Sequence, residues 1–250
     1  MEKPLLIDLE AEKPTRGKCV FRPLVKAMVI GDGYLSLEKG CRNARFGCLH
    51  SIKQKPYLLW KQKLLARAGL TTSYKEREDH GSALVAPTQG RCEMRSRVHP
   101  ALTAIYQRMY PKENGFSAGI LDDLGEMHLA IIFMDDGGKN AAAHSVPSGW
   151  PGSSCVNHYD RFVISFTIHL QSWGIKGCHQ FIDWLKRRFL VEARIGFQRG
   201  QPVVKVYKTE AKKRLRDVVE PHLVPTMKYK VEGRMHARPE RLSEGAPTLA

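Results

Sequence analysis

The sequence predicts a mixed α/β (α+β) fold, in which two similar halves each run helix, two strands, helix, two strands, helix. Residues 24–34 and 129–139 are apolar runs that each end in an aspartate followed by glycine. The two aspartates, Asp32 and Asp136, are 104 residues apart. After each run the period of the apolar residues changes from that of a helix to that of a strand. The matching order of these segments indicates an internal duplication.

The first half is predicted over residues 21–110, after a proline-punctuated arm of residues 1–20 on the surface. Pro23 suits the first turn of its leading helix, where the missing N–H costs nothing. That helix extends to Gly31. Further helices are predicted at residues 56–68 and 100–110.

Alternating segments at residues 45–53, 71–77 and 91–97 are predicted strands of the first half. In the last of these, Cys92, Met94 and Ser96 face inward and three of the four intervening residues are arginine. Such a face is usually a solvated surface. In a chain with this charge it also suits a sheet that lies along a polyanion.

Residues 111–125 join the halves, and the second half is predicted over residues 126–231. Residues 140–160, rich in Ala, Ser, Gly and Pro, are expected to form a loop or hairpin tip. A strand at residues 161–167 should turn Phe162, Ile164 and Phe166 inward. The remaining predicted elements are helices at 178–189 and 209–219, strands at 192–198 and 202–208, and a disordered tail at 232–250.

Composition narrows the kind of partner. The chain of 250 residues carries 40 Lys and Arg against 25 Asp and Glu, a formal net charge of +15 that is distributed along the sequence. This favours a polyanion partner, although a basic protein without such a partner has the same composition. The six cysteines show no C-x-x-C pair and no zinc spacing with histidine, which indicates a reducing, intracellular compartment. We find no signal peptide and no membrane span, so we expect no membrane partner.

Both apolar runs resemble the signature motif of the LAGLIDADG homing endonucleases, in the single-chain branch with two motifs. Residues 25–33 and 129–137 fall on its nine positions, and Asp32 and Asp136 take the penultimate acidic position. M-D-D-G-G-K at residues 134–139 looks like the second motif of intron-encoded members. Residues 54–65 are similar to the first helix after a strand in the family, and residues 221–230 to its closing P-x-L-x-P-x-M-x-Y-K segment.

This resemblance, over residues 22–231, implies two pseudo-symmetric halves whose motif helices pack together at the centre. Their antiparallel sheets form a saddle over double-stranded DNA with a long specific target site. The implied function of the monomer is site-specific double-strand cleavage, serving intron or intein-like mobility in a bacterial cytoplasm or an organelle. The alternatives are an intron RNA maturase and a catalytically silent DNA-binding protein of the same fold.

The two acids suit phosphodiester hydrolysis, since divalent ions held by hard oxygen ligands activate water and neutralise developing charge. Asp32 and Asp136 would supply carboxylates, and Gly31 and Asp135 their carbonyls, because helix C-termini present unpaired C=O groups. The resemblance implies Mg²⁺, for which Mn²⁺ can substitute. Either Asp-Gly on its own could equally be a simple turn.

The family also places a basic residue after the last helix of each half, and Lys112 and Lys230 match these positions, as polarisers of water or neutralisers of phosphate. Either could instead be a surface lysine. Three residues depart from the family pattern: Ile131 and Asp135 replace small residues where the motif helices pack, and Lys26 is expected to point outward. The predicted DNA contacts lie on the outer strand faces and at their rims: Arg42, Arg45, Lys53, Arg91, Arg95, Lys139, Arg161, Arg194, Gln198 and Lys205.

Overall fold

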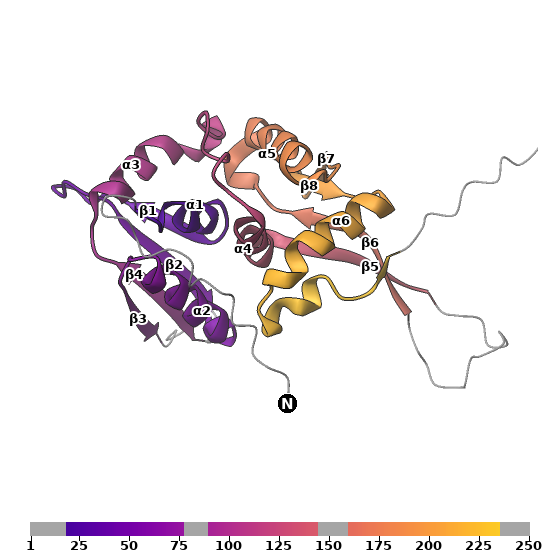
Figure 1. Ribbon diagram of the computed structural model, residues 1–250, viewed down its shortest axis with the longest axis horizontal. Coiled ribbons are helices and arrows are strands. Elements are labelled where there is room, and N and C mark those ends of the chain that lie inside the picture. The colour runs from indigo at the N-terminus through magenta and orange to yellow at the C-terminus, as the bar shows by residue number, and fades with distance from the viewer. Residues whose placement is uncertain (1–18, 78–89, 145–159, 236–250) are drawn as a thin grey trace, which may run out of the picture.

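Two helices, α1 (Arg22–Ile30) and α4 (Glu126–Asp136), lie side by side at the centre of the computed structural model, and each opens one half of the molecule (Figure 1). The structure describes residues 19–77, 90–144 and 160–235. On α4, every residue from Leu129 to Met134 is fully buried. A helix that is apolar on all sides is expected to be enclosed by protein, and here both halves enclose it.

The first half holds one antiparallel sheet of order β1-β2-β4-β3. Its remaining elements are β1 (Gly33–Ser36), β2 (Arg45–Ser51), α2 (Lys55–Arg67), β3 (Thr72–Arg77), β4 (Arg91–Ser96) and α3 (Pro100–Met109), with a 3-10 turn η1 (Ile52–Gln54) before α2. The residues of β2 and β4 that face the helices are Phe46, Cys48 and His50 on β2 and Cys92, Met94 and Ser96 on β4, all of them buried. The pattern of the sequence predicted this inner face correctly.

The second half repeats this plan, with the sheet order β5-β6-β8-β7 and a short β9 (Arg234–Met235) parallel to β6. Its elements are β5 (Gly137–His144), β6 (Asp160–Ile168), α5 (Gly174–Phe189), β7 (Arg194–Gln198), β8 (Gln201–Val206) and α6 (Thr209–Val219). Short 3-10 turns complete it: η2 (Lys112–Asn114) between the halves, then η3 (Gln171–Trp173), η4 (Glu220–His222) and η5 (Pro225–Lys230). The predicted fold class, two αββαββα halves with central motif helices, is confirmed.

Two expectations about the second half were wrong. The predicted loop at residues 140–160 begins too early, because β5 continues to His144; residues 145–159 lie outside the described part. Glycine and alanine have low strand propensity, but pairing with β6 overrides it. Ile164 is half-exposed, at 51%, rather than inward. The pairing of β5 with β6 shifts register between Asn140 and Ala141, which leaves Ile164 as the extra residue of a bulge and reverses the alternation.

The internal duplication can be followed residue by residue. Gly33 pairs with Cys48 across β1 and β2, and Gly137 pairs with Ile168 across β5 and β6, so Cys48 corresponds to Ile168. The buried positions of α2 recur on α5 at the same offset, namely 57 and 177, 58 and 178, 61 and 181, 64 and 184, 65 and 185. On this correspondence Lys61 matches Phe181, and His50 matches Leu170. The two halves therefore share a frame but differ in what fills it.

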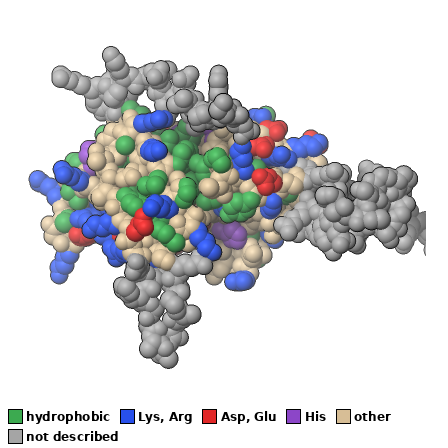
Figure 2. All heavy atoms as spheres, turned by 90° about the horizontal axis from the view of Figure 1, so that it is seen from below, with side chains coloured by type: hydrophobic (Ala, Val, Ile, Leu, Met, Phe, Trp, Pro, Cys, Tyr) green, Lys and Arg blue, Asp and Glu red, His purple; other side chains and the backbone are tan. Residues whose placement is uncertain are grey.

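One face of the molecule carries more basic than acidic side chains (Figure 2). Figure 2 shows one face of the molecule, on which Lys and Arg side chains are spread around a central group of hydrophobic side chains, with few Asp and Glu. No helix among the described residues is long and apolar enough to cross a membrane.

Candidate active site

The C-terminal ends of α1 and α4 bring the two motif acids to one place. Asp32 follows α1 directly after its C-cap residue Gly31, and Asp136 is the last residue of α4. The approach is close at this end, since a Cβ on Gly31 would lie 2.5 Å from the Cβ of Asp135. Only glycine fits there without displacement, so the sequence of the first motif sets the spacing of the helix ends.

Burial and neighbouring carboxylates raise the pKa values of both acids. Desolvation, then the carboxylates of Asp32 and Asp135, raise the pKa of Asp136 to about 7, while Lys230 and Lys112 oppose the rise. The pKa of Asp32 is raised by desolvation and then by Asp135. Carboxylates that resist ionisation in this way are stabilised by a cation placed between them.

Lys112 and Lys230 each lie against the C-terminal end of one motif helix. The Lys112 ammonium donates to the carbonyl of Val29 at 2.8 Å. The Lys230 ammonium donates to the carbonyls of Met134 at 2.5 Å, Asp135 at 3.2 Å and Phe133 at 3.4 Å. Val29 and Phe133 hold the same position in their motifs, so the two lysines are related by the duplication. Desolvation lowers the pKa of each.

The donor set fits a divalent cation. Asp32 and Asp136 offer hard carboxylate oxygens, the ligand type that Mg²⁺ prefers, and both retain an accessible fraction. The carbonyl of Asp135, one of the two expected backbone ligands, accepts a hydrogen bond from Lys230 at 3.2 Å. Gly31, the other, is partly exposed at the end of α1.

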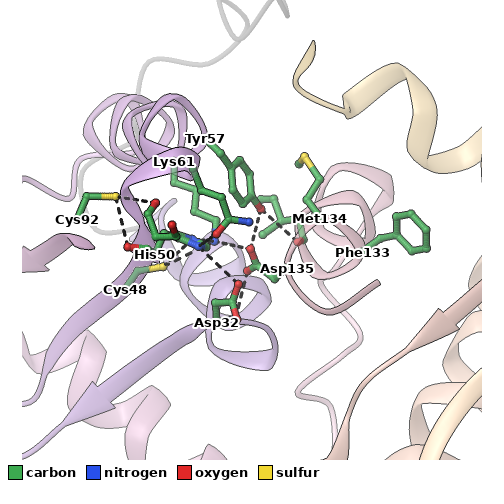
Figure 3. A network of polar contacts seen from close by, with 12 residues as sticks. Asp32, Cys48, His50, Tyr57, Lys61, Cys92, Phe133, Met134 and Asp135 are labelled. Carbon is green, nitrogen blue, oxygen red and sulfur yellow. Dashed lines mark hydrogen bonds and ion pairs between the residues drawn. The ribbon is translucent and has the colours of Figure 1, made fainter. Parts of the chain in front are cut away.

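A buried network of polar side chains lies next to this site (Figure 3). The sequence analysis did not predict it. The Asp135 side chain leaves α4 towards the first half and accepts hydrogen bonds from Lys61 Nζ at 2.6 Å and Tyr57 Oη at 2.9 Å. Lys61 and the Asp135 side chain are both fully buried. Lys61 also contacts His50 Nε2 at 3.1 Å and Cys48 Sγ at 3.6 Å. We call Asp135, Lys61, Tyr57, His50 and Cys48 the cross-half cluster.

The pKa values within the cross-half cluster follow from this pairing. Burial disfavours the Lys61 ammonium, but Asp135 and its hydrogen bond more than offset this, so the pKa of Lys61 is raised. Desolvation and then Lys61 lower the pKa of His50 to about 4, so His50 is neutral near pH 7. The oxygens and nitrogen of Asp32, His50 and Asp135 lie within 4.8 Å of one another, as metal ligands would. The Lys61 ammonium already supplies the cation to Asp135 in this group.

One signal in the sequence pointed to this cluster. Lys61 falls on the apolar stripe of its helix, between Tyr57 and Leu64, at spacings that share one face. A lysine on a buried stripe needs an acid. Asp135 departs from the family pattern, which has a small residue there. Nothing in the local sequence links it to Lys61, however, because the two residues are 74 positions apart.

The prediction that Lys26 points outward was wrong, because this residue is buried and only 6% exposed. Its ammonium lies 2.6 Å from the Asp123 carboxylate and 3.4 Å from the carbonyl of Ile120. The position is inward-facing because α1 is enclosed on this side too, by the connection between the halves. The buried lysine is tolerated because Asp123 neutralises it.

On the first sheet, the expected DNA contacts share the outer face, but an acid lies among them. Arg91, Arg95 and Glu93 alternate with the inward residues of β4, as predicted. Glu93 is buried by its partners, Arg77 at 2.9 Å, the Tyr34 hydroxyl at 3.2 Å and a very short contact to Arg95. Arg45 on β2 contacts Glu38 at 3.4 Å, and Arg42 and Lys53 are exposed beside the strand.

On the second sheet three of the expected contacts, Arg194, Gln198 and Lys205, share the outer face, whereas Lys139 pairs with the buried Phe166 and so lies on the opposite, core-facing side of its strand. Arg194 and Lys205 are cross-strand partners on β7 and β8, and Gln198 lies at the β7 end. The Arg194 guanidinium stacks 4.0 Å from the ring centroid of Tyr207. Lys139 donates to the carbonyl of Glu232 at 2.5 Å. Arg161 lies on β6, and its side chain is outside the described part.

Comparison with known proteins agrees with this architecture. The sequence profile of the LAGLIDADG DNA endonuclease family matches residues 25–213. Over 226 residues the chain is 26% identical to protein RecA of Mycobacterium shimoidei, covering 87% of this chain and 48% of that protein. Over 213 residues it is 27% identical to protein RecA of Mycolicibacterium flavescens, covering 83% and 45%. The chain thus spans about half the length of the curated relatives it matches.

Among solved structures, the homing endonuclease I-WcaI bound to its DNA recognition sequence superposes with a TM-score of 0.65 at 19% identity. The match covers 89% of this chain and 90% of that one, which shows a shared fold. The family profile spans most of the sequence and includes both acidic motifs. The chain therefore belongs to the LAGLIDADG DNA endonuclease family.

Proposed function

We propose that this protein is a site-specific endonuclease that cuts both strands of a duplex DNA target, with one motif acid serving each strand. The observation that carries the proposal is the pair of acids, Asp32 and Asp136, at the meeting ends of two related helices. Each acid has a raised pKa, and a related lysine lies beneath each helix end. A binding protein without catalysis has no need to bring carboxylates to a surface that meets phosphates.

The residues divide the work. Asp32 and Asp136 would hold divalent cations, Mg²⁺ or Mn²⁺, with the carbonyls of Gly31 and Asp135 as further ligands; such ions supply activated water and charge neutralisation at the scissile phosphate. Lys112 and Lys230 place positive charge at the negative ends of the motif helices and beside the phosphates. Their lowered pKa values favour exchange of a proton with water more than an exposed lysine would.

Recognition would fall to the outer faces of the two sheets. Phosphate contacts set affinity and base-edge contacts set sequence, and a long target site follows from two sheets side by side. On the first sheet, the Glu93 carboxylate pairs with both Arg77 and Arg95 and fixes their side chains, which suits directional contacts to bases better than loose attraction to phosphates. Aromatic stacking fixes Arg194 on the second sheet. The fold of I-WcaI, a structure bound to its recognition sequence, supports this placement.

The biological setting that we propose is mobility of an intervening element, with the protein acting as a monomer. The chain matches a little under half of the length of proteins named RecA, which suits an element carried by a host gene. The decisive experiment incubates the protein and Mg²⁺ with its own flanking DNA joined without the insertion. We expect one discrete double-strand cut, absent when a chelator is added.

An intron RNA maturase and a catalytically silent DNA-binding protein are the alternative outcomes of that experiment. Binding to the joined flanking DNA with no metal-dependent cut would favour the silent protein. Preference for folded intron RNA, again with no cut, would favour the maturase. Both motif acids are present here, which favours cleavage over either.

A further inference from the structure

The cross-half cluster makes the surroundings of the two acids unequal. Where the first half has Cys48, His50 and Lys61 around the inserted Asp135 side chain, the corresponding residues of the second half are Ile168, Leu170 and Phe181. All three of these are fully or almost fully buried and apolar. The residue that corresponds to Asp135 is Gly31, which sends no side chain across. The half that receives a carboxylate from its partner thus has polar residues at these positions, and the half that receives none has apolar residues there.

The cross-half cluster reaches Asp32 by two routes. The first is the backbone: the N–H of Asp32 donates to Asp135 Oδ2 at 3.3 Å. The same carboxylate is held at its other oxygen, Oδ1, by Lys61 and Tyr57. Asp135 therefore anchors the backbone of Asp32, just beyond the end of α1, although it belongs to the other half.

The second route runs through the ring of His50. The Lys61 ammonium has only donors, so His50 Nε2, 3.1 Å away, must accept a hydrogen bond. The proton of the neutral ring is then on Nδ1, which lies 3.1 Å from Gln54 Oε1 and 3.6 Å from Asp32 Oδ2. This N–H therefore donates to Gln54 Oε1, and the nitrogen that carries it lies close to the Asp32 carboxylate without a direct hydrogen bond to it. Lys61 uses its three donors on Asp135, His50 and Cys48, so this orientation is fixed.

We propose that Asp135, Lys61 and His50 are positioning residues for Asp32, and that the centre built on Asp32 depends on them far more than the centre built on Asp136 does. This inference rests on the proposed function, in which each acid serves one DNA strand. Asp136 lies beside Asp135 in the chain, but its counterpart environment is apolar. Loss of the cross-half cluster should therefore unbalance the two strand cuts and not merely lower the amount of active protein.

The test measures single-turnover cutting of each strand, with the two strands carrying different end labels. Asp135→Asn, Lys61→Met and the double variant that removes both charges together should each slow one strand at least tenfold more than the other, so that nicked DNA accumulates. The slowed strand should be the same in all three, and the same as in Asp32→Asn. Equal slowing of both strands, or none, would overturn the inference.

A matched control comes from another buried lysine, Lys26. Asp123→Asn breaks the Lys26–Asp123 pair, which has the same 2.6 Å separation and also holds α1, but does not touch Asp32. It should lower the midpoint of urea unfolding while leaving the ratio of the strand rates within twofold of wild type. A strand bias in this variant would mean that any loosening of α1 gives the effect, and would overturn the assignment.

A second measurement does not depend on cleavage. Nitrogen-15 spectra of histidine-labelled protein report the tautomer of each ring, and His50→Gln identifies the signal of His50. We expect the Nδ1–H tautomer in the wild type and its loss in Lys61→Met. An Nε2–H tautomer in the wild type would contradict the second route. If wild-type protein cut neither strand, the proposed function would fail, whereas this measurement would still judge the cross-half cluster.

Discussion

At the scale of single residues, Asp32 and Asp136 are expected to act on metal rather than on DNA. Asp32→Asn and Asp136→Asn each keep the shape of the side chain but remove its charge. Each should abolish double-strand cleavage and leave the affinity for target DNA within about tenfold, because a phosphate is repelled, not bound, by a carboxylate. Single-turnover cleavage and equilibrium binding without metal provide the two measurements. A variant that still cuts both strands at the wild-type rate would contradict the assignment.

Asp136 should also make the metal-free protein sensitive to pH. Its pKa is about 7 in the folded protein and ordinarily 3.8, so between these values the folded state binds more protons than the unfolded state. The contribution of this group to stability is therefore present at low pH and is lost as pH rises from about 4 to about 7. The free energy of unfolding in urea, with chelator present, measures it.

The comparison must be made against Asp136→Asn, because other groups titrate in the same range. The pKa values of His50 and His128 are lowered to about 4, and these groups contribute stability that grows as pH rises. The difference between wild type and Asp136→Asn removes their contribution. A difference that stays constant from pH 5 to 8 would show that Asp136 is not held in a protonated state. Mg²⁺ should restore stability to the wild type alone above pH 7.

Substitution of Lys112 and of Lys230 should each slow the cutting of a different DNA strand. Each donates to the carbonyl at the same motif position of its own half, Val29 or Phe133. Lys230→Met should slow one strand more than the other, and Lys112→Met should slow the opposite strand more, because each removes positive charge from one helix end. Strand-resolved single-turnover rates show this directly. Unchanged rates would return both residues to a purely structural role.

At the scale of elements, the contact between α1 and α4 depends on Gly31. Its φ of −85° is outside the left-handed region, and Asp135 leaves no space for a side chain at this position. In Gly31→Ala the new Cβ would meet Asp135 at 2.5 Å and push the helix ends apart. We expect a loss of about 1–3 kcal/mol in the free energy of unfolding, as for other overpacked sites.

Gly138→Ala is the control for this substitution. A Cβ at Gly138 meets nothing within 4 Å, and its φ is not in the left-handed region. This variant should stay within about 0.5 kcal/mol of wild type, as surface substitutions usually do. Equal losses in the two variants would argue against a tight crossing at Gly31.

The elements also show what a sequence can disclose. The motif helices and most strands follow from their periodicity, because burial alternates with the turn of the helix or the pleat of the strand. Strand β5 was not predicted because its Gly and Ala residues show no alternation of apolar and polar side chains. Ile164 was assigned to the wrong face because the alternation of a sequence does not reveal a bulge. Lys61 and Asp135 pair over a long separation, so their partnership exists only after the halves have met.

At the scale of the whole molecule, the net charge of +15 makes binding to any nucleic acid at low salt uninformative. At about 150 mM salt, where exposed charges are screened beyond about 8 Å, directional contacts from the two sheets should decide the outcome. We expect the joined flanking DNA to be preferred over scrambled duplex by on the order of a thousandfold, and over intron RNA as well. Competition binding measures both ratios, and a win for intron RNA would contradict duplex recognition.

The cross-half cluster also bears on how such a chain can be taken apart and rebuilt. Two copies of the first half, joined back to back, would set Gly31 against Gly31 and leave two buried lysines with no carboxylate. Two copies of the second half would place two aspartates against the apolar side chains of Leu170 and Phe181, which have no cation to pair with them. Breaking a buried ion pair by removing one partner costs about 3–5 kcal/mol, and each such twin would incur that cost twice. Each half therefore needs the other as its partner. A designer who exchanges halves between relatives must keep Lys61 of the first half together with Asp135 of the second.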